Sequence, residues 1–169
     1  DKDTSGLMMV AKNHHAHQEL SNQIKDRKVN KVYLALATGI VSPYTGLIDQ
    51  PIARDPRHRK RMAVVPGGRE SRTRYKVLET PANHTLLELI LETGRTHQIR
   101  VHLAYLGHPL LGDGVYGRTS SRLDRHFLHA YKLGFQHPRT GEPLEFQAEL
   151  PPDLAAVLED LKTAQAPIS

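Results

Sequence analysis

The sequence predicts an α+β fold in which a largely antiparallel mixed sheet is flanked by helices. Segments with strand patterns outnumber helical segments, and most of them follow one another directly along the chain. A doubly wound fold would instead alternate strands with helices. The 169 residues, of which 38% are hydrophobic and 24% charged, fit a single globular domain over residues 1–169.

The expected strands are short apolar or alternating runs bounded by turn-forming residues. They cover residues 7–11, 31–38, 47–52, 62–65, 73–78, 85–92, 127–135 and 144–148. The apolar run at residues 7–11 is expected to be a buried strand. We expect the glycine turn at Gly67 and Gly68 to join two strands into a hairpin, and the turn at residues 137–141 to join the last two.

The segment at residues 31–38 is apolar on both faces, which places it inside the sheet. One of its faces carries Tyr33, Ala35 and Ala37. Small side chains next to a single aromatic ring leave a hollow that Tyr33 can border. This strand is therefore a candidate wall for a binding site.

Three helices are expected. Asn13 is a suitable cap for the first, and the second has a complete pair of signals, with Thr96 as its cap and Gly107 as its stop. The third is expected to be capped by Asp153 and to run through Leu161. Each has apolar residues on one stripe, as in helices that pack on a sheet.

Composition excludes several classes of protein. Cysteine is absent, so disulfide scaffolds, thiolate zinc sites and cysteine nucleophiles are excluded, and a cytoplasmic location is expected. No apolar run approaches the ~20 residues that span a bilayer, and residues 1–5 are not a signal-peptide core. We therefore expect no association with a membrane.

The positive charge is concentrated in one segment. The net charge is +5, but residues 54–76 contain nine basic and two acidic residues. Arginine binds phosphate through two hydrogen bonds at once, so an arginine-rich segment indicates a nucleic-acid surface. The alternative is a solvated basic loop, and charge does not decide between the two.

Residues 94–102 (GRTHQIRVH) lie at a strand-to-helix turn, where free amide groups and the helix dipole favour an anion. Arg100 stands between Ile99 and Val101 at the edge of the core, where an arginine normally needs a carboxylate partner. The alternative to a functional arginine is a structural ion pair.

We expect neither a metal site nor a cofactor. His14, His15 and His17 crowd an exposed helix start and lack further ligands of the right kind. The sequence also contains no phosphate-binding glycine loop and no Gly-x-Ser-x-Gly nucleophile motif.

Four segments in order resemble the RluA/RluD-type family of RNA pseudouridine synthases over nearly the whole chain. The first is residues 1–7 (DKDTSGL), which resembles the end of the family's His-Arg-Leu-Asp-x-x-Thr-Ser-Gly motif. The second, residues 31–35 (KVYLA), resembles Lys-x-Tyr-x-Ala. The third is residues 94–102 with residues 107–117, and the last is residues 128–130 with His137 and Pro138.

The resemblance implies a catalytic role for Asp1, Tyr33 and Arg100. Asp1 aligns with the catalytic aspartate, Tyr33 with the active-site tyrosine and Arg100 with the partner of the aspartate. Pairing with Arg100 would favour the ionised form of Asp1. Tyr33 would stack on a uracil that has been extruded from the RNA, with its hydroxyl near C5.

The resemblance also implies that RNA is the partner, most directly large-subunit ribosomal RNA, with transfer RNA as the other class. No small-molecule cofactor is implied. The basic side chains would then contact phosphates without reading sequence. These candidates are Arg57, Arg59, Lys60, Arg61, Arg72, Arg95 and His97.

The sequence departs from the family pattern at its start, because the His-Arg-Leu that precedes the aspartate in the full motif is absent. We therefore expect the chain to be the C-terminal part of a catalytic domain, a pseudouridine synthase fold truncated at the N-terminus. Two other functions remain open at this point: a non-catalytic RNA-binding module, and a metal-dependent nuclease built on the histidines.

Overall fold

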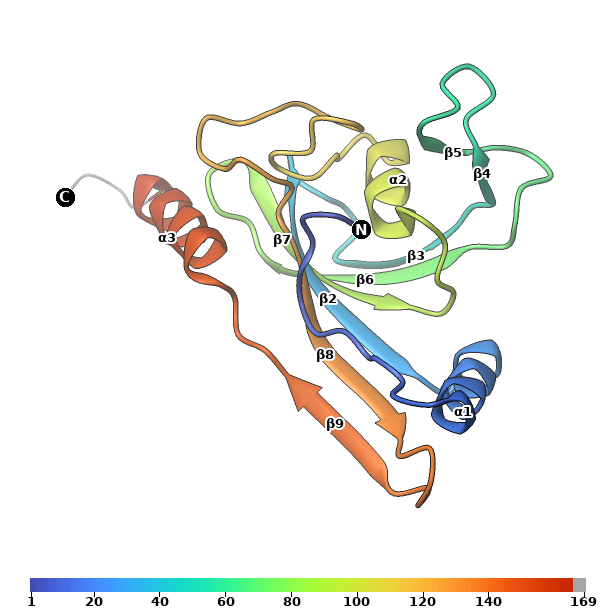
Figure 1. Ribbon diagram of the computed structural model, residues 1–169. Helices are drawn as coiled ribbons and strands as arrows, with labels where there is room; N and C mark the ends of the chain where they lie inside the picture. Colours follow the sequence, from blue (N-terminus) through green and yellow to red (C-terminus); the bar gives the residue numbers. More distant parts are fainter. Residues whose placement is uncertain (166–169) are drawn as a thin grey trace.

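A computed structural model describes residues 1–165 as a seven-stranded sheet, a two-stranded sheet and three helices (Figure 1). The strands are β1 (Ser5–Gly6), β2 (Asn30–Thr38), β3 (Thr45–Asp49), β4 (Ile52–Arg54), β5 (Met62–Val64), β6 (Arg72–Glu79), β7 (His84–Leu91), β8 (Leu128–Gln136) and β9 (Pro143–Gln147). The helices are α1 (His14–Lys25), α2 (Gln98–Tyr105) and α3 (Pro152–Gln165).

The large sheet has the strand order β1-β8-β2-β7-β6-β3, and β9 also pairs with β8. Its strand pairs are antiparallel except for the parallel pair of β1 and β8. Three helices accompany this sheet. The predicted α+β class with a largely antiparallel sheet is therefore confirmed.

Strand β2 lies inside the sheet, as its two apolar faces predict, with β8 on one side and β7 on the other. Ala35 and Ala37 pack into a core cluster that includes Ile99 and Leu103 of α2. Leu36, which points to the other face, packs into a second cluster with residues of α3. Helices α2 and α3 thus cover opposite faces of the sheet.

Helix α1 begins as predicted, because the Asn13 side chain accepts a hydrogen bond from the Ala16 amide at 2.9 Å. The helix is tied to the far end of β8 by Gln23. The amide group of this side chain donates to the carbonyl of Gln136 at 2.9 Å and accepts from its N–H at 2.8 Å. Ile24, expected on the apolar stripe, is half exposed.

Helix α2 starts differently from the prediction. Thr96 is not its cap; His97 is the N-cap residue, in the left-handed region at φ 58°, and its side chain makes no capping hydrogen bond. The turn is organised instead by the buried Gln98 side chain, whose oxygen accepts from the Arg95 amide at 3.0 Å. The predicted stop at Gly107 is confirmed, with φ +86°.

The predicted hairpin around Gly67 and Gly68 is wrong. Strand β5 pairs with β4, whereas β6 pairs with β3 and β7. After the turn the chain runs beside β4, where Arg69 and Ile52 exchange two backbone hydrogen bonds of 2.9 and 3.0 Å. Both segments have strand patterns, and a pattern does not specify the partner strand. Figure 1 shows β4 and β5 standing out from the large sheet; we call residues 52–64 the basic arm.

The predicted buried strand at residues 7–11 is also wrong. Only Ser5 and Gly6 pair with β8, and Met8 and Val10 beyond them are 82% and 72% exposed. Strand β9 occupies the same edge of β8 from Lys132 onwards, while β2 occupies the other edge. No edge of β8 remains for residues 7–11 to join.

Helix α3 begins at Pro152 and runs to Gln165. Asp153 lies in its first turn and is not the cap; its carboxylate accepts two hydrogen bonds from Arg125, at 2.8 and 3.1 Å. Within residues 1–165, none of the helices has both the length and the apolar character needed to cross a membrane.

Candidate active site

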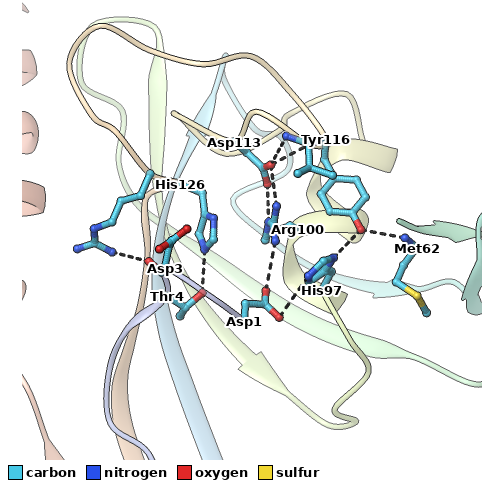
Figure 2. Close-up of polar contacts among 11 residues, drawn as sticks. Asp1, Asp3, Thr4, Met62, His97, Arg100, Asp113, Tyr116 and His126 are labelled. Carbon is cyan, nitrogen blue, oxygen red and sulfur yellow. Dashed lines mark hydrogen bonds and ion pairs between the residues drawn. The ribbon is translucent and has the colours of Figure 1, made fainter. Parts of the chain in front are cut away.

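The turn at residues 1–4 is held against the start of β8 (Figure 2). The Arg125 guanidinium donates to the carbonyl of Asp3 at 2.9 Å. The hydroxyl of Thr4 lies 2.8 Å from Nε2 of His126. These contacts fix the backbone of the segment that carries the first carboxylate of the chain.

The next two residues continue this attachment. The Ser5 hydroxyl lies 2.9 Å from Nδ1 of His129, and Nε2 of this ring lies 2.7 Å from the carbonyl of Ala148. A carbonyl only accepts, so Nε2 carries a proton, and in the neutral ring the Ser5 hydroxyl donates to Nδ1. At Gly6, φ +102°, a Cβ would stand 2.2 Å from the carbonyl oxygen of Ala130, so only glycine fits.

His126 is almost fully buried beside this turn. Burial, together with the positive charge of Arg100, lowers the pKa of His126 to about 4. The ring is therefore neutral at neutral pH. It binds Thr4 without adding a second positive charge next to Arg100.

Arg100 comes from the first turns of α2 and is only 5% exposed. Its Nε and Nη2 donate to the two carboxylate oxygens of Asp113 at 2.7 and 3.0 Å. The third nitrogen, Nη1, lies 3.8 Å from Oδ2 of Asp1. The structure thus brings Asp1 and Arg100 together, but the principal partner of Arg100 is Asp113 and not, as expected, Asp1.

Asp113 is the buried anchor of this pair. Its carboxylate also accepts the backbone N–H groups of Val115 and Tyr116, at 3.0 and 3.1 Å. Burial alone would raise the pKa of Asp113, but the hydrogen bonds from Arg100 and from the two amides outweigh it and hold this pKa below the usual value. Asp113 therefore stays ionised, and its hydrogen bonds leave Nη1 of Arg100 facing Asp1.

A second chain of contacts reaches Asp1 from the basic arm. The Tyr116 oxygen accepts the Met62 N–H at 2.9 Å and lies 2.7 Å from Nδ1 of His97. Nε2 of His97 lies 3.9 Å from Oδ1 of Asp1 (Figure 2). If the Tyr116 hydroxyl donates to Nδ1, the His97 proton is on Nε2, on the side of the Asp1 carboxylate but beyond hydrogen-bond distance from it.

The protonation state of His97 agrees with this arrangement. Burial and the nearby charge of Arg100 lower the pKa of His97, so the ring is neutral at neutral pH. Its φ of 58° is uncommon for a residue other than glycine and is often found at functional sites. His97 is therefore held as a neutral N–H donor close to Asp1.

Tyr33 lies on the face of β2 that packs against α2, next to the core cluster of Ala35 and Ala37. Burial raises the pKa of Tyr33, so its side chain is a neutral phenol at neutral pH. Among the described residues, Tyr33 forms no hydrogen bond with Asp1 or Arg100. The three predicted catalytic residues thus share one face of the sheet, but only two of them meet.

The predicted phosphate-binding residues fall into two groups. The side chains of Arg57, Arg59 and Lys60 are exposed at the tip of the basic arm and have no bonding partner within residues 1–165. They are free to bind an external anion. All three belong to residues 54–76, the segment in which the positive charge is concentrated.

The other predicted phosphate ligands are already engaged. Arg61 pairs with Asp55 at 3.3 Å, and its guanidinium lies over the ring of Tyr116. Arg72 pairs with Glu92 at 3.3 Å. Arg95 donates to a backbone carbonyl, and His97 faces Asp1. Their roles as phosphate ligands stay predictions.

No group of three histidine and carboxylate side chains in the described part of the chain has the arrangement of a metal site. His14, His15 and His17 are exposed at the start of α1.

Comparison with known proteins identifies the fold and the family. A family model described as RNA pseudouridylate synthase matches residues 1–105. The chain belongs to this family. The RNA pseudouridylate synthase match covers Asp1, Tyr33 and Arg100, and the resemblance found in the sequence is confirmed.

Members of the pseudouridylate synthase family with known sequences are close to this chain. An uncharacterized RNA pseudouridine synthase of Chloroflexus aurantiacus is 54% identical over 96% of this chain and 52% of its own length. The ribosomal large subunit pseudouridine synthase D of Nitrosomonas europaea is 49% identical over 96% of this chain and 49% of its own length. The chain spans about half the length of these relatives.

Two solved structures of pseudouridylate synthase domains share the fold. Human RNA Pseudouridylate Synthase Domain Containing 4 matches with a TM-score of 0.78 and 26% identity, over 96% of this chain and 73% of that chain. Domain Containing 1 matches with a TM-score of 0.74 and 29% identity, over 94% and 76%. The predicted pseudouridine synthase fold is therefore confirmed.

Three residues of this cluster were not among the predicted site residues: Asp113, Tyr116 and His126. Asp113 could have been found, because a buried arginine requires a carboxylate and Asp113 follows the apolar pair Leu110 and Leu111. Tyr116 lies in the third motif but was given no role there, and His126 gave no signal. Their contacts with the site depend on the path of the loop between α2 and β8.

Proposed function

We propose that this chain carries the catalytic centre of an RNA pseudouridine synthase that converts specific uridines to pseudouridine in large-subunit ribosomal RNA. Family membership and the relatives named as ribosomal large subunit synthases support this proposal. The observation that carries it is the Asp1 carboxylate 3.8 Å from the buried Arg100 guanidinium. We also propose a cytoplasmic location.

The proposed reaction is an isomerisation. The N1–C1′ glycosidic bond of uridine breaks, the uracil turns in its pocket, and C5 bonds to C1′. The proton on C5 leaves and N1 gains a proton, so that no atom or electron is lost overall. One positioned carboxylate can serve as the nucleophile or the base of such a sequence.

Asp1 is the carboxylate placed for this step. Its side chain is only 18% exposed and lies within 4 Å of both Arg100 and His97. The buried Arg100 guanidinium places a positive charge 3.8 Å from this proposed nucleophile or base. The neutral His97 ring lies 3.9 Å from the other carboxylate oxygen.

Tyr33 suits a stacking role. An enzyme that acts on a base in structured RNA must first extrude it, which costs a few kcal/mol and has to be offset by new contacts. The neutral ring of Tyr33, on the same face of the sheet as α2, can supply a stacking contact. Because burial raises the pKa of Tyr33, stacking is favoured over a role as the base that removes the C5 proton.

Phosphate contacts are assigned to the tip of the basic arm. Arg57, Arg59 and Lys60 are exposed and have no partner in the described chain. Such side chains bind the RNA backbone without reading its sequence and supply free energy toward base extrusion.

The experiment that tests this function compares two neighbouring aspartates in the full-length protein. Asp1→Asn removes the carboxylate that faces Arg100. Asp3→Asn is the matched control, because the Asp3 side chain is exposed and its φ of 72° suits asparagine. Pseudouridine is mapped in ribosomal RNA from cells that lack the gene and express each variant.

We expect Asp3→Asn to restore pseudouridine at the target position and Asp1→Asn to restore none. The Asp1→Asn protein should still bind RNA with the affinity of the wild type. Full modification by Asp1→Asn would exclude the proposed catalytic role. Binding without modification by any variant, the wild type included, would instead indicate a non-catalytic RNA-binding module.

A further inference from the structure

A cavity of about 410 Å³ lies between the end of α1, the start of β2 and the loop that joins β7 to α2. Its wall is strongly basic. The basic residues that line it are Lys25, Arg27, Lys31, Arg69 and Arg95. The cavity lies outside the cluster around Asp1, and Lys31 is not among the predicted phosphate ligands.

The acidic groups near this cavity are committed to other partners. Glu70 pairs with Arg27 at 2.9 Å. Glu92, which lines the cavity, pairs with Arg72 at 3.3 Å and also with Arg74. Within residues 1–165, neither Lys31 nor Arg95 forms an ion pair with a carboxylate. Lys31 and Arg95 are thus neighbouring cations without an ion pair, and Glu70, whose charge acts on Arg95, is bound to Arg27.

Lys31 is an unusual lysine for this reason. Burial lowers the pKa of Lys31, and the charge of Arg95 lowers it further. Its Nζ lies close to Gly94, where a Cβ would stand 3.1 Å from it. A partly buried cation without a partner costs free energy, and a bound anion would recover it.

The position of Lys31 relates the cavity to the active site. Lys31 and Tyr33 are two residues apart on β2 and point to the same face. Two residues of a strand span about 6.6 Å. The two side chains therefore leave β2 close together on one face of the sheet. An anion at Lys31 would thus lie near a uracil stacked on Tyr33.

We propose that this cavity, with Lys31 and Arg95 as its ligands, binds the phosphodiester adjacent to the extruded uridine. The inference rests on the proposed function, and it adds a phosphate site apart from the exposed side chains at the tip of the basic arm. Contacts at this cavity and at the tip of the arm would hold the RNA strand at two places.

The test begins with Lys31→Gln in the full-length protein and a synthetic RNA stem-loop that contains the mapped target uridine. Lys31→Arg keeps the charge. Lys12→Gln removes an exposed lysine without an ion pair elsewhere on the surface and is the matched control. We expect Lys31→Gln to weaken binding about tenfold and to lower the slope of log Kd against log salt by ~0.7 to 0.9, as for one lost phosphate contact.

The second part removes the charge from the RNA. Methylphosphonate replaces the phosphodiester on the 5′ or the 3′ side of the target uridine. At one of these two positions the replacement should weaken binding by the wild type and by Lys12→Gln, but have no further effect on Lys31→Gln. Lys31→Arg should respond like the wild type. The proposal would be overturned if, on both the 5′ and the 3′ side, the losses of binding free energy from Lys31→Gln and from the methylphosphonate simply add.

The readouts separate this inference from the proposed function. Wild-type turnover on the same stem-loop tests the function, while the coupling between Lys31 and the phosphate tests the cavity. Turnover without coupling rejects the cavity alone, and absence of turnover in every RNA rejects both. Thermal unfolding of Lys31→Gln at the wild-type temperature verifies that its fold is intact.

Discussion

Arg100 and Arg59 carry the same charge, but the protein holds them in opposite ways. Arg100 is 5% exposed, bound by two hydrogen bonds to Asp113 and within 4 Å of Asp1. Arg59 is exposed on the basic arm, and its guanidinium has no partner in the described chain. One charge is fixed before any substrate arrives, and the other is free to move.

This difference agrees with the two tasks proposed for these residues. A charge that stabilises a reacting carboxylate is most effective when its position is already set and water is excluded. A charge that binds an RNA backbone has to follow phosphates whose positions vary, and a solvated side chain does this at little cost. Tyr116 contacts both regions, because it meets Met62 of the arm and His97 beside Asp1.

The largest effect on stability is expected where the fixed charge loses its partner. Asp113→Asn leaves the Arg100 guanidinium buried without a counter-charge, which typically costs about 3–5 kcal/mol in the free energy of unfolding. Asp49→Asn is the control, because Asp49 is exposed and pairs with Arg72 at 3.6 Å; it should cost less than ~1 kcal/mol. Urea unfolding at pH 7 measures both.

The Asp113 effect should also depend on pH. The pKa of Asp113 is held below its usual value, so its stabilisation is present above the pKa of the unfolded state and is lost as pH falls through the lower folded-state pKa. The difference between wild type and Asp113→Asn should therefore shrink below about pH 4. A difference that stays constant down to pH 2 would show that Asp113 is not the buried anion of this pair.

The second effect tests whether the buried His126 ring beside Arg100 is neutral. The pKa of His126 is lowered to about 4, below the ~6.5 of an unfolded histidine. The neutral His126 ring thus contributes fully to stability above pH 6.5. As the pH falls toward 4, this contribution is lost and the free energy of unfolding drops by up to about 3 kcal/mol. Urea unfolding between pH 7 and pH 4.5 should show a flatter pH dependence for His126→Gln. Parallel curves for variant and wild type would contradict the burial of a neutral ring.

A smaller effect is expected at the connection between the two regions. Tyr116→Phe removes the hydroxyl that donates to His97, and the loss of one such hydrogen bond should lower kcat about tenfold. The hydroxyl favours the neutral ring, so its loss should raise the pKa of His97 and shift the acid limb of the kcat profile to higher pH. The exposed Tyr105→Phe is the control. If the pH dependence of kcat is not shifted, Tyr116 does not act on the reaction through His97.

The smallest effect on turnover is expected on the basic arm. We replace Arg57, Arg59 and Lys60 together by alanine; Arg61 is left intact because it pairs with Asp55 and covers Tyr116. The triple variant should weaken RNA binding and lower the salt slope by about 2 to 3, with kcat unchanged at saturating RNA. An unchanged slope would show that the arm is merely solvated.

The sequence predicted the sheet better than its connections. Alternation in β2 and in the β8–β9 hairpin was sufficient to place these strands, because both depend on local patterns. The pairing of β5 and the exposed course of residues 7–11 depend on which strand edges are already occupied. No local pattern contains that information.

The candidate site was predicted in part for the same reason. The motifs placed Asp1 and Arg100 correctly next to each other, but charge alone did not show that Asp113 is the closer partner of Arg100. Among the basic residues, a run of positive charge did not distinguish the free Arg59 from the paired Arg61. That distinction is made by Asp55 and Tyr116, which only the fold brings to Arg61.

The most direct test of the link between Asp1 and Arg100 is a double-mutant cycle on single-turnover rates, with Asp1→Glu and Arg100→Lys. Both variants keep the charge but change its position, so measurable activity should remain. If the two groups act as one unit, the single-turnover rate of the double variant should fall by a much smaller factor than the product of the factors for the two single variants. Losses that multiply would show that Asp1 and Arg100 act independently, and would contradict the catalytic site proposed for this protein.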